Sequence, residues 1–226
     1  MTVIKGMIFD ADGTLLDSMP IWDDLGVRYL KELGVEAEPG LSEILFCMSL
    51  EESAAYMKRT YGLSQTEEEI RRGVLAKLED FYVNEVQAKP GVSEYLRAMH
   101  KRQIPMMIAT SSSRHHIEEA MRRLCFLDYF AGIITCEEVG AGKSRPDIYL
   151  KCAETMGLDP EEVCVVEDVI HAVRTANAAG FPTAGVYDAA SAEDTENMKK
   201  ECSIYLHDLT DYSEFCRWAF AECPTG

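Results

Sequence analysis

Four short polar clusters contain residue types that can carry out chemistry on a phosphate group. The first is the stretch 10–14, which reads DADGT, and the second is Thr110 with three serines after it. The third contains Lys143, and the fourth is the pair Glu167-Asp168. Carboxylates can bind Mg²⁺ or act as nucleophiles, hydroxyl groups bind phosphate oxygens, and lysine neutralises them. Together these clusters predict phosphoryl chemistry.

A carboxylate that approaches a phosphate needs cations nearby. At about 4 Å from a dianionic phosphate and an effective dielectric constant of 20, the carboxylate meets about 8 kcal/mol of repulsion. A metal ion and Lys143 are the cations that would offset this repulsion. We therefore predict Mg²⁺ as the cofactor.

Short apolar segments must position these clusters. Strands are expected at 3–9, 105–109, 132–135, 163–166 and 183–187, and helices at 114–124, 147–156 and 169–179. This alternation predicts an α/β fold, a Rossmann-like parallel sheet with helices on both faces. In such sheets ligands bind at the carboxyl ends of the strands, and the four polar clusters fall at such ends.

The segment 16–88 has a different pattern, which is helical throughout. A helix over 21–33 ends at Gly34, and capping-box spacing occurs at 49–52 and at 64–67. We predict that 1–15 and 89–226 form an α/β catalytic core, and that 16–88 forms an inserted all-helical cap.

Composition narrows the classes of partner. The net charge of −17 disfavours nucleic acid and an anionic membrane, whereas a local cation still permits a phosphorylated substrate. The eight cysteines include no C-x-x-C pair and are typical of free thiols in a reducing compartment. No apolar run approaches the ~18 residues of a membrane span, and no signal peptide precedes the first acidic residues. We expect a cytoplasmic monomer.

The stretch 10–18, DADGTLLDS, resembles the first motif of the haloacid dehalogenase-like superfamily. Thr110, Lys143 and Glu167-Asp168 match its second, third and fourth motifs in order, and the helical segment resembles the small cap of subfamily I. The resemblance covers nearly the whole chain. Two places depart from the family pattern: Ser144 stands where proline is frequent, and 169–172 reads VIHA where relatives often begin with serine and end with glycine.

The resemblance implies catalytic roles. Asp10 would attack phosphorus and become an aspartyl phosphate, and Asp12 would protonate the leaving oxygen and then activate water. Thr110, Ser111 and Lys143 would bind the transferring phosphoryl group, with Lys143 fixing it to Asp10.

The resemblance also implies a metal site. Mg²⁺ would be held by Asp10, the backbone carbonyl of Asp12, and Asp168, with Glu167 supporting the metal shell. Dehalogenases of the superfamily lack an aspartate two places after the nucleophile, so Asp12 favours phosphoryl chemistry.

The leading hypothesis is a phosphatase for a small phosphorylated metabolite. Trp22, Cys47 and Met48 are candidate substrate contacts in the cap, although they would serve equally well as ordinary cap core. The alternative is a mutase that resembles β-phosphoglucomutase through the segment 45–53. Such mutases carry arginine where this chain has Leu50 and histidine where it has Trp22, and both differences weaken the mutase hypothesis.

Other interpretations stay open at this point. A phosphonoacetaldehyde hydrolase would need a cap lysine, for which Lys58 is available, and an inactive binding module is the hypothesis from another class. Arg114 is a nearby arginine that could bind a second phosphate. We interpret His115 and His116 as first-turn helix residues, with a catalytic role as the alternative.

Overall fold

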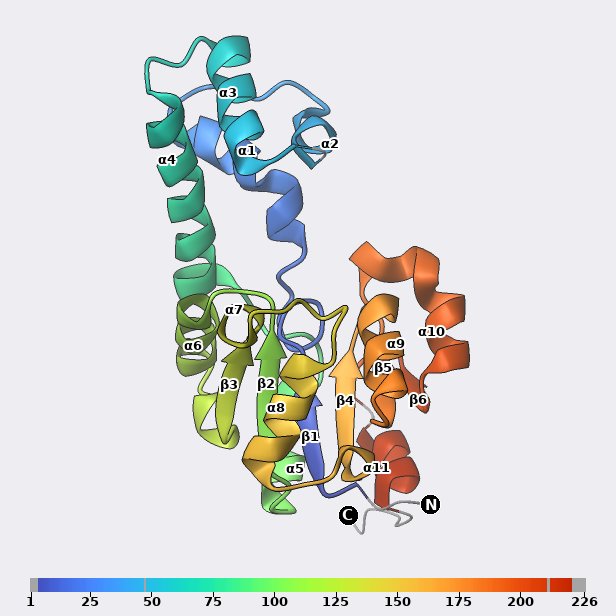
Figure 1. The fold of residues 1–226 in the computed structure, drawn as a ribbon. Coiled ribbons are helices and arrows are strands. Elements are labelled where there is room, and N and C mark those ends of the chain that lie inside the picture. Colours follow the sequence, from blue (N-terminus) through green and yellow to red (C-terminus); the bar gives the residue numbers. More distant parts are fainter. Residues whose placement is uncertain (1–3, 47, 211, 221–226) are drawn as a thin grey trace. The chain divides into compact units, whose positions relative to one another are not determined.

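The computed structural model describes residues 4–46, 48–210 and 212–220. The chain divides into two compact units, one made of Met1–Asp17 with Gln87–Gly226 and the other of Ser18–Val86. The first unit contains a sheet and helices, and the second is helical (Figure 1). That the first unit is the catalytic core and the second a cap stays a prediction.

The sheet confirms the predicted α/β class. Within the described residues it has six strands in the order β3-β2-β1-β4-β5-β6, and every neighbouring pair is parallel. The strands are β1 (Gly6–Phe9), β2 (Met106–Thr110), β3 (Gly132–Thr135), β4 (Val163–Glu167), β5 (Thr183–Val186) and β6 (Ile204–Leu206).

Helices connect these strands and cover the sheet. The α-helices of this unit are α5 (Val92–Lys101), α6 (Arg114–Arg123), α7 (Cys136–Val139), α8 (Asp147–Met156), α9 (Ile170–Ala178), α10 (Thr195–Glu201) and α11 (Tyr212–Phe220). Short 3₁₀ turns are η2 (Leu127–Tyr129), η3 (Pro160–Glu162) and η4 (Ala189–Asp194).

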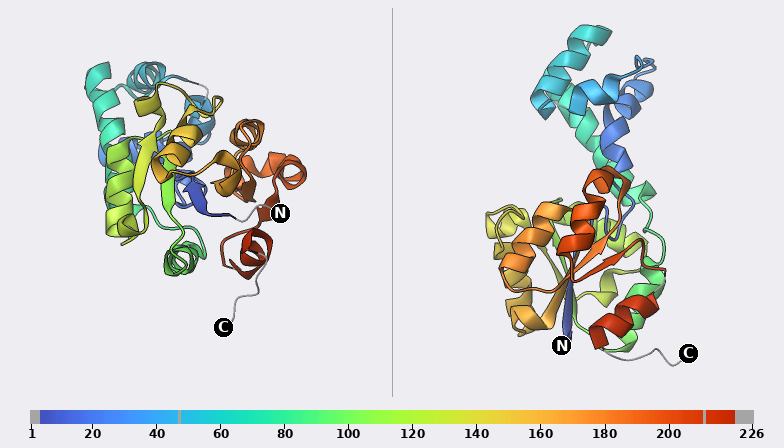
Figure 2. Two further views of the ribbon diagram at one scale, coloured as in Figure 1. Left: turned by 60° about the horizontal axis from the view of Figure 1, so that its bottom comes forward. Right: turned by 90° about the vertical axis from the view of Figure 1, so that its right-hand side faces the viewer.

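Alternating side chains of β1 show why both faces are covered. Ile8 is buried in a cluster with Tyr149 of α8, whereas the ring of Phe9 lies 6.0 Å from that of Tyr95 in α5. Tyr95 in turn lies 5.3 Å from Phe215 of α11. Successive strand residues point to opposite faces, so β1 is apolar along its whole length. Figure 2 shows the helices on the two sides of the sheet.

The second unit is a cluster of helices with its own apolar core. Its helices are α1 (Pro20–Glu32), α2 (Leu41–Phe46), α3 (Leu50–Tyr61) and α4 (Glu67–Asp80), and α4 continues into the π-helical turn η1 (Phe81–Glu85). The core consists of Tyr29, Leu30, Leu41, Ala54, Met57, Leu63, Ile70 and Val74.

Helix α4 lies close to α1 because Gly73 has no side chain. A Cβ at Gly73 would lie 2.2 Å from Cε2 of Tyr29. The buried face of α4 includes Ile70 and Val74, whereas Leu75 is 38% exposed. The buried face of α4 therefore does not include every hydrophobic residue of the helix, since Leu75 lies outside it.

The two predicted capping boxes have different outcomes. The box at Ser49 is confirmed, because its hydroxyl accepts from the Glu52 amide at 3.1 Å and the Glu52 carboxylate accepts in return at 2.8 Å. The box predicted at 64–67 is wrong. Thr66 caps α4, accepting from the Glu69 amide at 3.2 Å. Because three glutamates follow one another at 67–69, the spacing fits a box from Ser64 to Glu67 and also one from Thr66 to Glu69. Helix α4 begins at Glu67, which makes Thr66 the N-cap residue.

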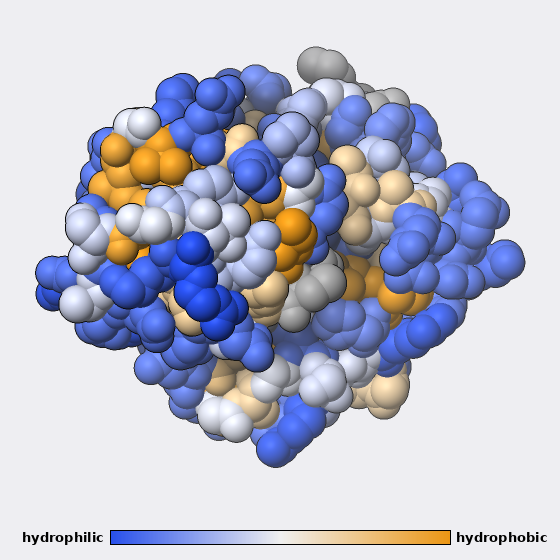
Figure 3. All heavy atoms as spheres, turned by 90° about the horizontal axis from the view of Figure 1, so that it is seen from above, coloured by the Kyte–Doolittle hydropathy of each residue, from blue (hydrophilic) through white to orange (hydrophobic). Residues whose placement is uncertain are grey.

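Much of the surface is polar. Figure 3 shows one face, on which hydrophilic residues predominate and hydrophobic residues form separate patches. Within the described ranges, no helix combines the length and the apolar character that crossing a bilayer requires.

Gly91, the N-cap residue of α5, is expected to tolerate an added side chain poorly. Its φ is +81°, and an added Cβ would lie 2.2 Å from backbone atoms of Leu209 and Thr210. We expect Gly91→Ala to lower the free energy of unfolding by about 3 kcal/mol, because left-handed strain and overpacking add.

Gly157 provides the matched control. Its φ is +69°, but no described atom outside its immediate surroundings lies within 4 Å of the added Cβ. Gly157→Ala should therefore cost about 1 kcal/mol, from backbone strain alone. Urea unfolding measures both changes, and equal losses in the two variants would contradict the packing argument.

Candidate active site

The first, second and fourth polar clusters meet at the carboxyl edge of the sheet. Strand β1 lies between β2 and β4, and Asp10 follows β1 directly. The Asp10 amide donates to the carbonyl of Val166 at 2.9 Å. Thr110 and Glu167 are the last residues of the two flanking strands. The parallel pairing therefore places three candidate residues side by side, as ligand sites in such sheets require.

Lys143 joins this group from the loop between α7 and α8. Its ammonium group contacts Oδ1 of Asp10 and donates to Oε1 of Glu167 at 2.7 Å. The hydroxyl of Tyr149 donates to the same Glu167 oxygen at 2.8 Å. All four side chains are buried. The structure thus fixes Lys143 between Asp10 and Glu167.

Burial and charge determine the protonation of this pair. Burial raises the pKa of Asp10 well above its ordinary range; Lys143 opposes this shift, and the neighbouring Glu167 and Asp168 add to it. Burial alone would lower the pKa of Lys143, but the Asp10 and Glu167 carboxylates more than offset it and raise that pKa. Lys143 therefore remains a cation beside Asp10.

Three buried carboxylates could hold a metal ion. Asp10, Glu167 and Asp168 each offer one oxygen, and these oxygens lie within 4.8 Å of one another. The hydroxyl of Thr14 donates to Oδ1 of Asp168 at 3.2 Å. Gly13 has a φ of +83°, and a Cβ there would lie 2.4 Å from Oδ2 of Asp168. This donor set consists of hard oxygen ligands, which fits Mg²⁺.

The electrostatics of Asp168 also fit a cation. Burial raises its pKa to about 7, with further contributions from Glu167 and Asp188, against the opposing effects of Lys143 and Lys89. Gathering carboxylates in a desolvated place is unfavourable without positive charge. A divalent cation among these oxygens would relieve the repulsion.

The Asp12 carboxylate is not one of the three grouped carboxylates. The hydroxyl of Ser112 donates to its Oδ2 at 2.6 Å, and the amide of Ser112 donates to Oγ1 of Thr110 at 3.0 Å. The Asp12 side chain is therefore oriented by the loop after β2.

The two predicted phosphate-binding hydroxyls differ in their surroundings. Thr110 is fully buried at the end of β2, whereas Ser111 is exposed and its hydroxyl lies 3.4 Å from the sulfur of Cys136. Ser113 stands at the N-cap position of α6 but makes no side-chain capping bond. The loop after β2 therefore presents hydroxyl groups in three different settings.

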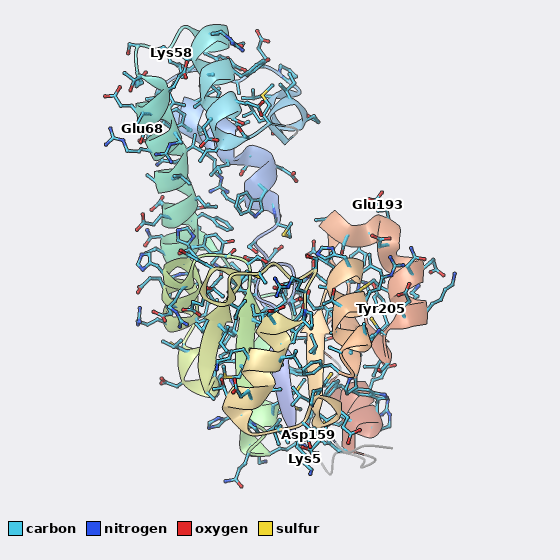
Figure 4. The ribbon with its side chains drawn as sticks, in the orientation of Figure 1. Lys5, Lys58, Glu68, Asp159, Glu193 and Tyr205 are labelled. Atoms are coloured by element: carbon cyan, nitrogen blue, oxygen red, sulfur yellow. The ribbon has the colours of Figure 1, made fainter. Side chains whose placement is uncertain are left out.

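The charged residues that served the alternative interpretations have structural partners. Arg114 binds Glu138 through two hydrogen bonds of 2.7 and 2.8 Å and donates to the carbonyl of Ile133 at 2.6 Å. Lys58, labelled in Figure 4, donates to the carbonyls of Leu63 and Gln65 at the turn before α4. Both side chains thus stabilise local structure.

The prediction that His115 and His116 are first-turn helix residues is confirmed. His115 and His116 occupy the first turn of α6, and His115 is exposed. Their rings are 6.2 Å apart, measured between centroids.

Two candidate substrate contacts line one cavity inside the helical unit. Trp22 and Met48 border a space of about 430 Å³, together with Leu50. Cys47, the third candidate, lies outside the described residues. The other lining residues are Met19, Leu25, Gly26, Leu45, Ser53, Met57 and Val74. Among the described residues this lining contains no charged side chain.

Sequence reasoning missed two residues of the site. Ser112 was one of three adjacent serines, and nothing in their order distinguished the one that contacts Asp12. Tyr149 lies in a helix whose apolar pattern indicated only core packing, although its hydroxyl reaches Glu167. Both side chains act through tertiary contacts that spacing along the chain does not encode.

Comparison with known proteins identifies the family of this chain. A family model described as haloacid dehalogenase-like hydrolase matches residues 7–186. Hexitol phosphatase A of Escherichia coli is 31% identical over 205 residues, which cover 91% of each chain. The phosphorylated carbohydrates phosphatase of Thermotoga maritima is 27% identical over 178 residues, covering 79% of this chain and 82% of its own.

Solved structures share the fold. A candidate β-phosphoglucomutase from Thermotoga maritima superposes with a TM-score of 0.83 at 23% identity, over 95% of this chain and 99% of its own. CbbY from Rhodobacter sphaeroides, solved in complex with phosphate, superposes with a TM-score of 0.69 at 20% identity, over 92% of this chain and 96% of its own. The family match spans most of the chain and includes every motif residue of the α/β unit. The chain therefore belongs to the haloacid dehalogenase-like hydrolase family, in the subfamily I branch that its phosphatase relatives occupy.

Proposed function

We propose that this protein is a Mg²⁺-dependent phosphatase that hydrolyses a small phosphorylated metabolite through an aspartyl phosphate on Asp10. The observation that carries the proposal is the buried group at the carboxyl edge of the sheet. There Lys143 bridges Asp10 and Glu167, and an Asp168 oxygen lies within 4.8 Å of theirs. A nucleophile, a fixed cation and a candidate metal site thus occur together.

In the first step Asp10 attacks the phosphorus atom of the substrate. The bond from phosphorus to the alcohol oxygen breaks, and Asp12, acting as an acid, gives this oxygen its proton. Ser112, which donates to Asp12 at 2.6 Å, keeps the acid in place. Lys143 and the Thr110 loop bind the oxygens of the transferring group.

In the second step Asp12 acts as a base. It takes a proton from water, the water oxygen attacks phosphorus, and the bond between phosphorus and Asp10 breaks to release inorganic phosphate. Both steps need the same carboxylate near the same face of the phosphoryl group. The hydrogen bond from Ser112 to Asp12 can therefore serve both steps.

Asp10 and Asp168 would hold the metal ion, together with the backbone carbonyl of Asp12 that the family resemblance implies. Mg²⁺ supplies positive charge that offsets the repulsion between the nucleophile and the phosphate. Glu167 accepts from both Lys143 and Tyr149, so we assign it to linking the metal site with Lys143.

The helical unit would serve as a cap that shields the intermediate and selects the substrate. Its cavity is lined by Trp22, Met48 and Leu50 and is mainly apolar. Among the described residues that line it there is no cation with which a second phosphate could pair. We therefore expect the non-phosphorylated end of the substrate to be uncharged.

This expectation separates the phosphatase from a mutase. A mutase must bind a second phosphate while the intermediate persists, and Arg114, the candidate for that task, is paired with Glu138 and Glu118. The protein should be incubated with β-glucose 1-phosphate and a catalytic amount of the 1,6-bisphosphate. We expect inorganic phosphate as the main product. Efficient conversion to glucose 6-phosphate without phosphate release would establish the mutase instead.

A panel of monoesters tests the phosphatase itself. It should contain p-nitrophenyl phosphate and a hexitol phosphate, with 2-phosphoglycolate as the comparison whose remaining end is charged, each assayed with and without Mg²⁺. We expect Mg²⁺-dependent phosphate release from at least one of them. Binding of these compounds without any turnover would support the inactive module.

A further inference from the structure

Lys89 lies just past the point at which the chain returns from the helical unit to the α/β unit. The α/β unit resumes at Gln87, and the Lys89 side chain is only 11% exposed. Its ammonium group donates to the carbonyls of Gly13 at 2.5 Å and Tyr187 at 2.7 Å, and to Oδ2 of Asp188 at 2.7 Å. An ammonium group has three hydrogens to donate, so these contacts use its full capacity.

One of these bonds restrains the loop that follows the nucleophile. Gly13 belongs to the 10–14 stretch, and it packs so closely on Asp168 that a Cβ would lie 2.4 Å from Oδ2. The backbone of Lys89 reinforces this contact, since its amide donates to the carbonyl of Leu15 at 3.0 Å. Lys89 thus fixes the backbone of the loop on which Asp10 and Asp12 lie.

The other end of this network leads to Asp168. Asp188 accepts from the amide of Ala190 at 2.9 Å and so fixes the first turn of η4. Ser191 in that turn donates through its hydroxyl to the carbonyl of Asp168 at 2.9 Å. Through Asp188 and Ser191, Lys89 is connected to the second loop that carries a candidate metal ligand.

We propose that Lys89 is a positioning residue that sets the separation between the 10–14 loop and Asp168, and thereby the affinity for Mg²⁺. The inference rests on the proposed metal site. Lys89 has no part in the catalytic steps assigned above. It acts through the backbone of one loop and through the η4 turn that supports the other.

The sign of the effect distinguishes positioning from simple electrostatics. Removing a positive charge near a cation site would, through the field alone, strengthen Mg²⁺ binding. It would also leave Oδ2 of Asp188 without its cationic partner. Loosening the two loops has the opposite effect, because residues that orient metal ligands contribute about 10- to 100-fold to affinity.

The test compares Mg²⁺ titrations of the complete chain in four forms. These are the unsubstituted protein, Lys89→Met, Ser191→Ala and the control Lys101→Met, in which an exposed lysine of α5 is replaced. Two quantities are followed. The first is the rise in melting temperature with Mg²⁺, which reports binding without turnover. The second is the Mg²⁺ concentration that gives half-maximal hydrolysis of p-nitrophenyl phosphate.

We expect Lys89→Met to need at least about 10-fold more Mg²⁺ in both measurements, with a smaller change in the KM for the phosphate ester. Ser191→Ala, which changes no charge, should weaken Mg²⁺ binding by about 2- to 10-fold, as loss of one hydrogen bond does. Lys101→Met should match the unsubstituted protein. If Lys89→Met does not fold, the Mg²⁺ titration of Ser191→Ala tests the positioning role by itself.

Unchanged or tighter Mg²⁺ binding in Lys89→Met would overturn the positioning role, as would unchanged binding in Ser191→Ala. Failure of the proposed function has a different signature. In that case Mg²⁺ would neither raise the melting temperature of the unsubstituted protein nor support its activity.

Discussion

Replacing Asp10 by asparagine is expected to reduce turnover by at least about 10⁴-fold, since loss of a nucleophile removes the covalent route altogether. An amide oxygen is a poor nucleophile, and the substitution also removes the negative charge that Lys143 contacts. Phosphate release from p-nitrophenyl phosphate measures the effect. The melting temperature should be recorded alongside, because Asp10 is buried among charged groups.

Asp12→Asn provides the matched comparison for Asp10→Asn. It should slow turnover by about 10²- to 10⁴-fold, the range for loss of a general acid or base. Its binding of Mg²⁺ should stay close to that of the unsubstituted protein, because the family resemblance assigns only the backbone carbonyl of Asp12 to the metal. Asp10→Asn should instead weaken Mg²⁺ binding. Near-normal turnover in Asp10→Asn would contradict the assignment of the nucleophile.

Removal of the metal ion is expected to have the second largest effect. Treatment with EDTA should lower phosphatase activity by about 10³-fold, because a bound divalent cation contributes several kcal/mol to stabilisation of the transition state. Added Mg²⁺ should restore the activity. The physical reason is the buried group formed by Asp10, Glu167 and Asp168, whose oxygens lie within 4.8 Å of one another.

Calcium is the control for the metal experiment. Ca²⁺ prefers longer bonds and more ligands than Mg²⁺, so it should bind without supporting comparable turnover. Full activity in the chelated protein, with no gain on adding Mg²⁺, would contradict a metal-dependent mechanism.

The sequence predicted the sheet because buried parallel strands are continuous apolar runs. Met106–Thr110 and Val163–Glu167 are of this kind, and each ends in polar residues that mark the carboxyl edge. Strand β6 (Ile204–Leu206) was not predicted, because it has three residues and lies at the edge of the sheet between polar neighbours. Helices α5, α10 and α11 were also missed.

The motif residues of the candidate site could be predicted from the sequence more readily than the residues that orient them. Asp10, Lys143 and Asp168 follow apolar strands or belong to motifs with a fixed order along the chain. In the sequence, Lys89 is only the first residue after the predicted cap, yet its three acceptors come from residues 13, 187 and 188. Contacts between residues so far apart in the chain arise from tertiary packing, which no local pattern specifies.

The most direct test of the central claim is to trap the intermediate on Asp10. The protein is mixed with Mg²⁺ and p-nitrophenyl phosphate, quenched in acid within one turnover, and treated with borohydride, which reduces an acyl phosphate to an alcohol. Peptide mass spectrometry then locates the product. We predict homoserine at position 10 and unchanged aspartate at position 12, with neither change when substrate is omitted. Modification at Asp12, or none at either residue while phosphate is released, would contradict Asp10 as the nucleophile.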